Sequence, residues 1–169
     1  GYCVHPDHVK KYDNLKKLKN KTNYLAIEVT DLKARSGNNF KQIQKLLNRY
    51  QYLNLVLDTS HINDIKSKYK NEPNFIEYCN FFRKRIVEIQ ISSNENNYKK
   101  NIFTEDFKTD HSLLAISSKN IAVQLLKMPY FKNLNLVIEG VVPYSLYGSR
   151  LLSKEISILK KIIKKNRIE

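Results

Sequence analysis

Four short apolar segments of this sequence each end at or near a polar residue that can bind a metal ion. These polar residues are Glu28 in YLAIEV, Asp58 in LNLVLDTSH, Gln90 in IVEIQIS and Glu139 in LNLVIEG. The N-terminal stretch YCVH ends in the same way with His5. Runs that are nearly all apolar predict strands covered on both faces, as in a parallel sheet. Parallel strands with polar residues at their C-terminal ends are typical of (β/α) barrels, which build their functional sites there.

Helical patterns separate these strands. Phe40, Ile43 and Leu47 recur at helical spacing, and Asn39 is expected to cap their helix. Asp7 is expected to cap an earlier helix in the same way. Strands and helices therefore alternate along the chain, which predicts a parallel sheet with right-handed crossovers. The expected helices cover residues 7–20, 39–50, 61–84 with an interruption at Pro73, 119–128 and 151–165, and a long loop over the site is expected at 93–110.

The length of the chain limits how much of a barrel it can form. A complete (β/α)₈ barrel typically needs about 250 residues, whereas this chain has 169. We therefore expect one α/β domain over residues 1–169, a partial parallel (β/α) barrel of five βα units. The chain starts inside a strand and without Met, so we expect a processed chain or one half of a larger barrel.

Two further features bear on where the protein works. The sequence has no apolar run long enough to predict a membrane span. Cys3 and Cys79 lack the spacing of metal ligands. They are expected to be reduced thiols in the cytoplasm or another reducing compartment.

The net charge of +14 suggests an anionic partner such as nucleic acid. The alternative is a compositional bias toward Lys, Asn, Ile and Tyr that spreads lysines over solvated surfaces. The basic residues are spread along the sequence, so both readings stay open.

Three carboxylates close apolar strands, namely Glu28, Asp58 and Glu139. A buried carboxylate without a partner costs several kcal/mol. If the three meet at one barrel mouth, a divalent ion would relieve their mutual repulsion. The alternative is that they pair with basic side chains of the next loop, for which Lys33 and Arg35 are candidates.

The choice of metal depends on which side chains join these carboxylates. Asp58 and His61 are three residues apart in a predicted strand-to-helix turn and can face one ion. Oxygen ligands alone favour Mg or Mn, whereas histidine ligands favour Zn. The expected metal ligands are Glu28, Asp58, His61, Gln90, His111, Glu139 and His5.

The ordered motifs HPD, AIEV-TD-LKARSG, LVLDTSH, VEIQIS, DHSLL and LVIEG resemble the xylose-isomerase-like TIM barrels. That superfamily includes the endonuclease IV type of AP endonuclease and the sugar isomerases and epimerases. The resemblance spans nearly the whole chain and implies the last five βα units of that barrel.

In the endonuclease IV type, three zinc ions serve to cleave the phosphate backbone at abasic sites. By this resemblance, His5 matches the ligand of the HPG motif and Glu28 the bridging glutamate. Asp58 and His61 match the D-x-x-H pair, and Glu139 matches the last-strand glutamate. The chain departs from the pattern in two places, with Gln90 for the histidine of strand seven and Thr109-Asp110-His111 for the D-x-H pair.

In the isomerase branch of the superfamily, a Glu, Asp, His and Glu hold one metal. The corresponding residues here are Glu28, Asp58, Gln90 and Glu139, so the histidine is again absent. In some of those enzymes the two glutamates also move the proton, which implies catalytic roles for Glu28 and Glu139.

Two functions are compatible with these residues. The first is a metal-dependent enzyme, with phosphodiester hydrolysis favoured over sugar isomerisation because the positive charge suits a polyanion. Lys33 and Arg35 would then hold phosphates. The second is a non-catalytic, basic binding or scaffolding subunit of a larger, RNA-containing assembly. A partial barrel leaves edge strands open, so its partner would be a separate N-terminal half, a second copy or such an assembly.

Overall fold

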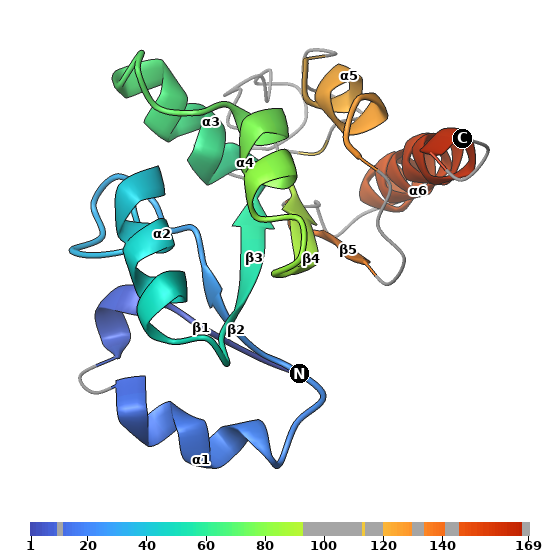
Figure 1. The fold of residues 1–169 in the computed structure, drawn as a ribbon. Coiled ribbons are helices and arrows are strands. Elements are labelled where there is room, and N and C mark those ends of the chain that lie inside the picture. The colour runs from blue at the N-terminus through green and yellow to red at the C-terminus, as the bar shows by residue number, and fades with distance from the viewer. Residues whose placement is uncertain (10–11, 93–112, 114–119, 130–133, 141–145, 167–169) are drawn as a thin grey trace.

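The structure is a computed structural model that describes residues 1–9, 12–92, 113, 120–129, 134–140 and 146–166. Five parallel strands form one sheet in the order β1-β2-β3-β4-β5, so each strand lies beside its neighbour in the sequence (Figure 1). The strands are β1 (Tyr2–Val4), β2 (Leu25–Glu28), β3 (Asn54–Asp58), β4 (Ile86–Ile91) and β5 (Asn135–Ile138).

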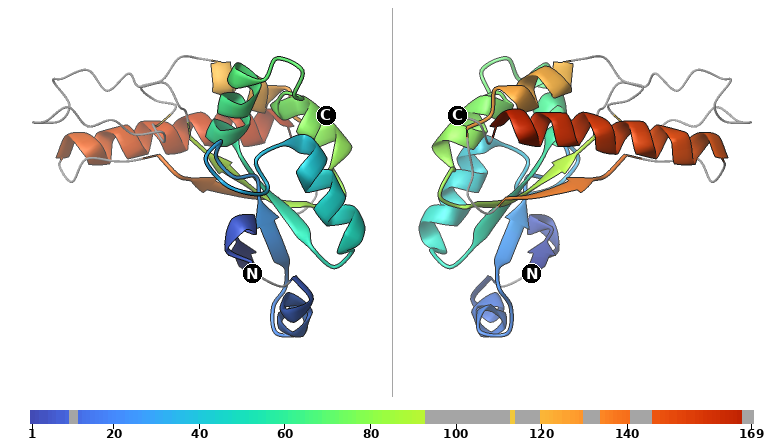
Figure 2. Two further views of the ribbon diagram at one scale, coloured as in Figure 1. Left: turned by 90° about the vertical axis from the view of Figure 1, so that its left-hand side faces the viewer. Right: turned by 90° about the vertical axis from the view of Figure 1, so that its right-hand side faces the viewer.

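Helical segments connect the strands. Those from residue 40 onward lie along one side of the curled sheet, whereas the short helix at 16–19 lies apart from them, near the start of β2 (Figure 2). The result is an open, all-parallel half-barrel with flanking helices, which confirms the parallel sheet and the strand–helix alternation expected from the sequence. The helical elements are η1 (Pro6–His8), η2 (Tyr12–Leu15), α1 (Lys16–Lys19), α2 (Phe40–Arg49), α3 (Thr59–Lys68), α4 (Phe75–Phe81), α5 (Asn120–Leu126) and α6 (Leu146–Asn166).

The hydrophobic core lies between the sheet and the helices. Ile43 and Leu47 of α2 are buried there, because they lie on one face of this helix. Side chains alternate between the two faces of a strand, so the core residues of a strand are two apart, except where a register shift between β3 and β4 separates Ile86 from Ile89. The strand residues of the core are Leu25, Ile27, Leu55, Leu57, Ile86, Ile89 and Ile91.

The opposite face of the sheet, which we call the inner face, carries the remaining strand residues. The register places Glu28 beside Val56 and Asp58 beside Gln90, so the predicted strand-end residues share this face. The Tyr24 hydroxyl donates a hydrogen bond across it to Glu88 Oε2 at 3.0 Å. The strand residues on the inner face include Ala26, Glu28, Asn54, Val56, Asp58, Glu88, Gln90, Asn135 and Val137.

Local sequence signals explain most helix boundaries. Asn39 caps α2 by accepting a hydrogen bond from the Gln42 amide at 3.0 Å, as predicted. The helical region 61–84 is split in two around Pro73, also as predicted. Asn74 and Glu77 form a capping box at the start of the second piece, α4.

Two expected boundaries are wrong, and one expectation lies outside the described residues. Asp7 does not cap a helix, because its carboxylate contacts the His5 ring and it lies inside the 3₁₀ turn η1. Helix α6 begins at Leu146, five residues before the expected start, and includes Gly148, a residue type that is unfavourable inside a helix. The loop expected at 93–110 lies outside the described residues. In the described part of the chain, no helix has the length and hydropathy of a membrane span.

Candidate functional site

Asp58 stands at the junction of β3 and α3 and uses its two carboxylate oxygens differently. Oδ1 accepts hydrogen bonds from the Ser60 amide at 2.7 Å, the Ser60 hydroxyl at 2.7 Å and the His61 amide at 3.2 Å, so it caps α3. Oδ2 lies 3.4 Å from His61 Nε2. The D-T-S-H motif therefore combines a helix cap with a candidate metal ligand, because the first turn of the capped helix carries the histidine.

Glu28 approaches the same histidine from the neighbouring strand. Its Oε1 lies 3.9 Å from His61 Nε2. Glu28, Asp58 and His61, which we call the acid–histidine cluster, offer ligand atoms that all lie within 4.8 Å of one another. The three side chains are 15%, 0% and 11% exposed, so the cluster is largely withdrawn from water.

Burial makes ionisation of these carboxyl groups unfavourable. Burial, and next the charge of Asp58, raise the pKa of Glu28 to about 7, while His5 acts in the opposite direction. Burial, together with a hydrogen bond to Asp58 and the charges of Asp58 and Glu28, also raises the pKa of Glu139. Three of the predicted ligands, one each from β2, β3 and the end of β5, are thus close enough to interact electrostatically.

Gln90 is the predicted ligand on β4 and pairs in register with Asp58. Its Oε1 is buried and has no hydrogen-bond partner among the described residues. A buried amide oxygen without a partner is unfavourable, whereas a divalent ion accepts such an oxygen as a ligand. The donor set around the acid–histidine cluster therefore fits a divalent ion.

His5 belongs to a different group of side chains. Its Nδ1 lies 2.6 Å from Asp7 Oδ1, and His8 Nε2 lies 3.8 Å from the same oxygen. These three residues, the turn cluster, also offer ligand atoms within 4.8 Å of one another. Sequence reasoning gave Asp7 and His8 no role in the site. The signal that could have found them is the H-x-D-H spacing in a turn directly after a strand.

The two basic residues expected to hold phosphate both lie in the loop after β2, and both are exposed. The Lys33 amide donates to Asp31 Oδ1 at 2.6 Å, which shapes this loop. Arg35 lines a cavity beside α2. His111, the remaining predicted ligand, lies outside the described residues together with Asp110.

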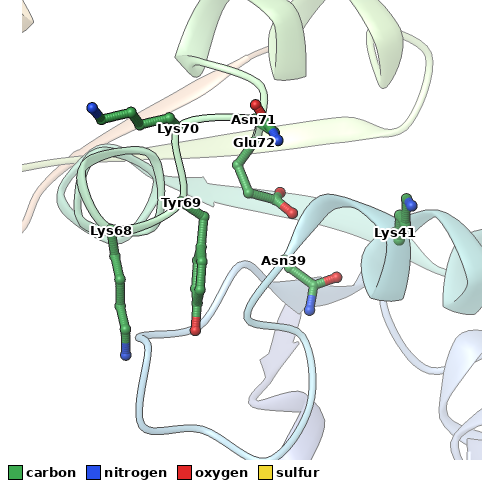
Figure 3. Close-up of a pocket in the computed structure, with 7 residues that line it drawn as sticks. All are labelled: Asn39, Lys41, Lys68, Tyr69, Lys70, Asn71 and Glu72. Carbon is green, nitrogen blue, oxygen red and sulfur yellow. The ribbon is translucent and has the colours of Figure 1, made fainter.

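A basic cavity that the sequence did not predict lies at the N-terminus of α2, with a volume of about 640 Å³. Figure 3 shows that the amino groups of Lys41, Lys68 and Lys70 point away from one another. Glu72 Oε2 accepts a hydrogen bond from the Phe40 amide at 3.0 Å, so one backbone amide of the first turn of α2 has a partner. This lysine cavity therefore does not focus positive charge on one point.

The acid–histidine cluster has the chemistry of a metal-ligand set with mixed oxygen and nitrogen donors. It lies at the C-terminal ends of β2 and β3, where parallel α/β sheets bind their ligands. No family model and no curated protein matches the chain in comparisons with known proteins.

Proposed function

We propose that the chain is the metal-binding part of a divalent-metal-dependent enzyme with the xylose-isomerase-like TIM-barrel fold, and that it hydrolyses phosphodiesters. The observation that carries this proposal is the convergence of Glu28, Asp58 and His61 within 4.8 Å at the C-terminal ends of adjacent parallel strands. The net charge of +14 favours a polyanionic substrate over a neutral sugar.

A metal explains this arrangement better than ion pairs with the loop. Lys33 and Arg35 are exposed, and the ion-pair contact described for Glu28 is with His61. Two buried carboxylates side by side repel each other, which a divalent ion relieves. A donor set that includes an imidazole suits Zn or Mn. When bound, the ion would polarise a phosphoryl oxygen as a Lewis acid.

The chain's own residues have distinct tasks in this proposal. Asp58 Oδ1 caps α3, and Oδ2, which lies 3.4 Å from His61 Nε2, would be the oxygen that binds the cation. His61 Nε2 faces both carboxylates and would complete the ligand set. Glu28 would supply the second carboxylate of the ligand set; burial raises its pKa to about 7 in the metal-free chain, and a bound divalent ion would favour its ionised form. Glu139 would retain its proton and hydrogen-bond to Asp58.

The test measures metal content first and activity second. The chain should bind a stoichiometric Mn²⁺ or Zn²⁺ ion in isothermal titration. Asp58→Asn keeps the capping oxygen but removes the charge, so it should lose the ion while retaining the helix. A labelled duplex with one abasic site should be cleaved only by the ion-loaded wild type. Absence of any bound ion at saturating Mn²⁺ and Zn²⁺ would refute the proposal, whereas conversion of an aldose without cleavage would indicate the isomerase branch.

The open half-barrel favours a second candidate, a basic binding subunit without catalysis. β1 and β5 are edge strands of the described sheet, and each presents unpaired backbone groups to a partner. Gln90 is neutral where the resemblance implies a histidine ligand. The partner would be an N-terminal half-barrel, a second copy or an RNA-containing assembly. Sedimentation of the chain alone distinguishes a self-associated form from a monomer.

A further inference from the structure

A cavity of about 380 Å³ lies between α2 and the residues that follow β1. This volume is within the range of sites for small molecules. We call it the α2 cavity. Its lining includes Pro6 and Tyr12 after β1, Arg35 after β2, and Lys45, Leu46 and Arg49 of α2.

Three of these side chains are cationic. Lys45 and Arg49 are four residues apart on α2, so they lie on the same face of the helix. Arg35 reaches the same cavity from the loop after β2. Among the described residues, no salt bridge joins Arg35, Lys45 or Arg49 to a carboxylate within 4.0 Å.

The single carboxylate among the lining residues is Asp7, and His5 contacts it at 2.6 Å. The hydrogen bond from His5 lowers the pKa of Asp7, so this carboxylate is engaged with the turn cluster. The α2 cavity therefore has excess positive charge. Arginine guanidinium groups form paired hydrogen bonds to phosphate oxygens, and a lysine adds a point charge.

Apart from the polar side chains of Ser36 and Gln42, the rest of the lining is apolar or aromatic, and several contacts hold it in place. Pro6 is buried, and its carbonyl accepts a hydrogen bond from the Tyr12 hydroxyl at 3.0 Å. The Tyr12 ring stacks on Tyr50, with centroids 5.0 Å apart and planes at 19°. The Tyr52 hydroxyl donates to the Tyr12 carbonyl at 2.5 Å. These contacts fix the wall, so the cavity exists before any ligand arrives.

We propose that the α2 cavity binds a nucleotide, with its phosphate on Arg35, Lys45 and Arg49 and its base or sugar on the apolar wall. An apolar surface beside clustered cations matches the two halves of a nucleotide. The nucleotide is either free or one unit of a nucleic acid. The inference rests on the function proposed above, because it names a part of the polyanionic substrate and where it is held.

Binding is measured with the full chain in EDTA, so that the result does not depend on the acid–histidine cluster. The two probes are a fluorescent adenosine monophosphate and a fluorescein-labelled single-stranded decanucleotide. The test variant is Arg35→Ala/Lys45→Ala/Arg49→Ala. The matched control is Lys41→Ala/Lys68→Ala/Lys70→Ala, which removes the same charge from the lysine cavity.

The test variant should bind the mononucleotide at least about tenfold more weakly than the control does, because it loses its charge-assisted phosphate contacts. For the decanucleotide, the slope of log affinity against log salt should fall by about 2, at about 0.7 per lost contact on a single strand. Weakening with the mononucleotide alone identifies a free nucleotide as the ligand. Weakening with the decanucleotide alone identifies a unit of nucleic acid.

Equal weakening in both variants would show that only net charge matters and would overturn the inference. No binding of either probe by the wild type would overturn it as well. Circular dichroism checks the fold of both triple variants, and the single charge reversal Lys45→Glu provides a second variant if the triple one unfolds. If nucleotide binding persists while no metal binds, the inference stands and the proposed enzyme fails.

Discussion

Replacing Glu28 with glutamine should stabilise the metal-free protein at neutral pH and remove the stabilisation that a divalent ion provides. The reason is the burial of this carboxyl group beside Asp58, which raises its pKa from 4.5 to about 7. Glutamine has nearly the same shape and no charge at any pH. The two effects therefore have opposite signs in one variant, which a simple loss of packing cannot reproduce.

The magnitude follows from the difference between the pKa in the folded chain and the ordinary value. Each pKa unit corresponds to about 1.4 kcal/mol, so a rise from 4.5 to about 7 amounts to about 3 kcal/mol. The folded chain holds this proton more tightly than the unfolded chain. Its contribution to stability is complete below pH 4.5 and is lost as the pH rises to about 7.

Urea unfolding at pH 8 in EDTA measures the first effect. Glu28→Gln should raise the free energy of unfolding by up to about 3 kcal/mol over the wild type. Asp13→Asn is the control, because Asp13 is exposed, and it should change stability by less than about 0.5 kcal/mol.

Repeating the unfolding with excess Mn²⁺ or Zn²⁺ measures the second effect. An ion at about 100 times its Kd should add about 2.7 kcal/mol to the wild type and much less to the variant. The reasoning is refuted if Glu28→Gln is less stable than the wild type in EDTA and still gains the full stabilisation from the ion.

Three further substitutions test how the scaffold holds the site. Arg85 donates hydrogen bonds to the carbonyls of Leu53 and Tyr50 at the end of α2, so Arg85→Ala should lower the free energy of unfolding by about 2 kcal/mol in urea. Gly37 has φ +79°, and a Cβ there would lie 2.5 Å from Pro6 Cγ, so Gly37→Ala should cost more than about 1 kcal/mol by the same assay. Asp58→Ala should destabilise the metal-free protein by about 1 kcal/mol more than Asp58→Asn, since only alanine removes the cap of α3; equal losses would contradict that capping role.

The sheet and the main helices could be predicted because their signals are local. The apolar run before Glu28 and the spacing of Ile43 and Leu47 each depend on a few neighbouring residues. Because strands and helices alternate, strands that are consecutive in the sequence are expected to lie side by side in the sheet. This is also why Glu28 and Asp58 could be placed on adjacent strand ends before their contact with His61 was known.

The rest depends on side-chain choices that a sequence does not reveal. Asp is a residue type that often caps helices, but the carboxylate of Asp7 contacts the His5 ring instead of the amides of a helix. Arg35 could turn toward Glu28 or toward α2, and the path of the loop decides between them. The sequence also does not show that Asp58 uses one oxygen to cap α3 and directs the other toward His61. An aspartate at the end of a strand has the same sequence pattern in either role.

The alternation of side chains along the strands also separates charge between the two sides of the molecule. The inner face carries Glu28, Asp58 and Glu88 and no basic strand residue, although the chain as a whole has a charge of +14. The mouth of the half-barrel therefore attracts cations, while the flank beside α2 attracts anions. An order of binding follows from this separation. Under the proposed function, a phosphate would be repelled at the mouth until a divalent ion had entered, whereas it could bind on the flank before or after the ion.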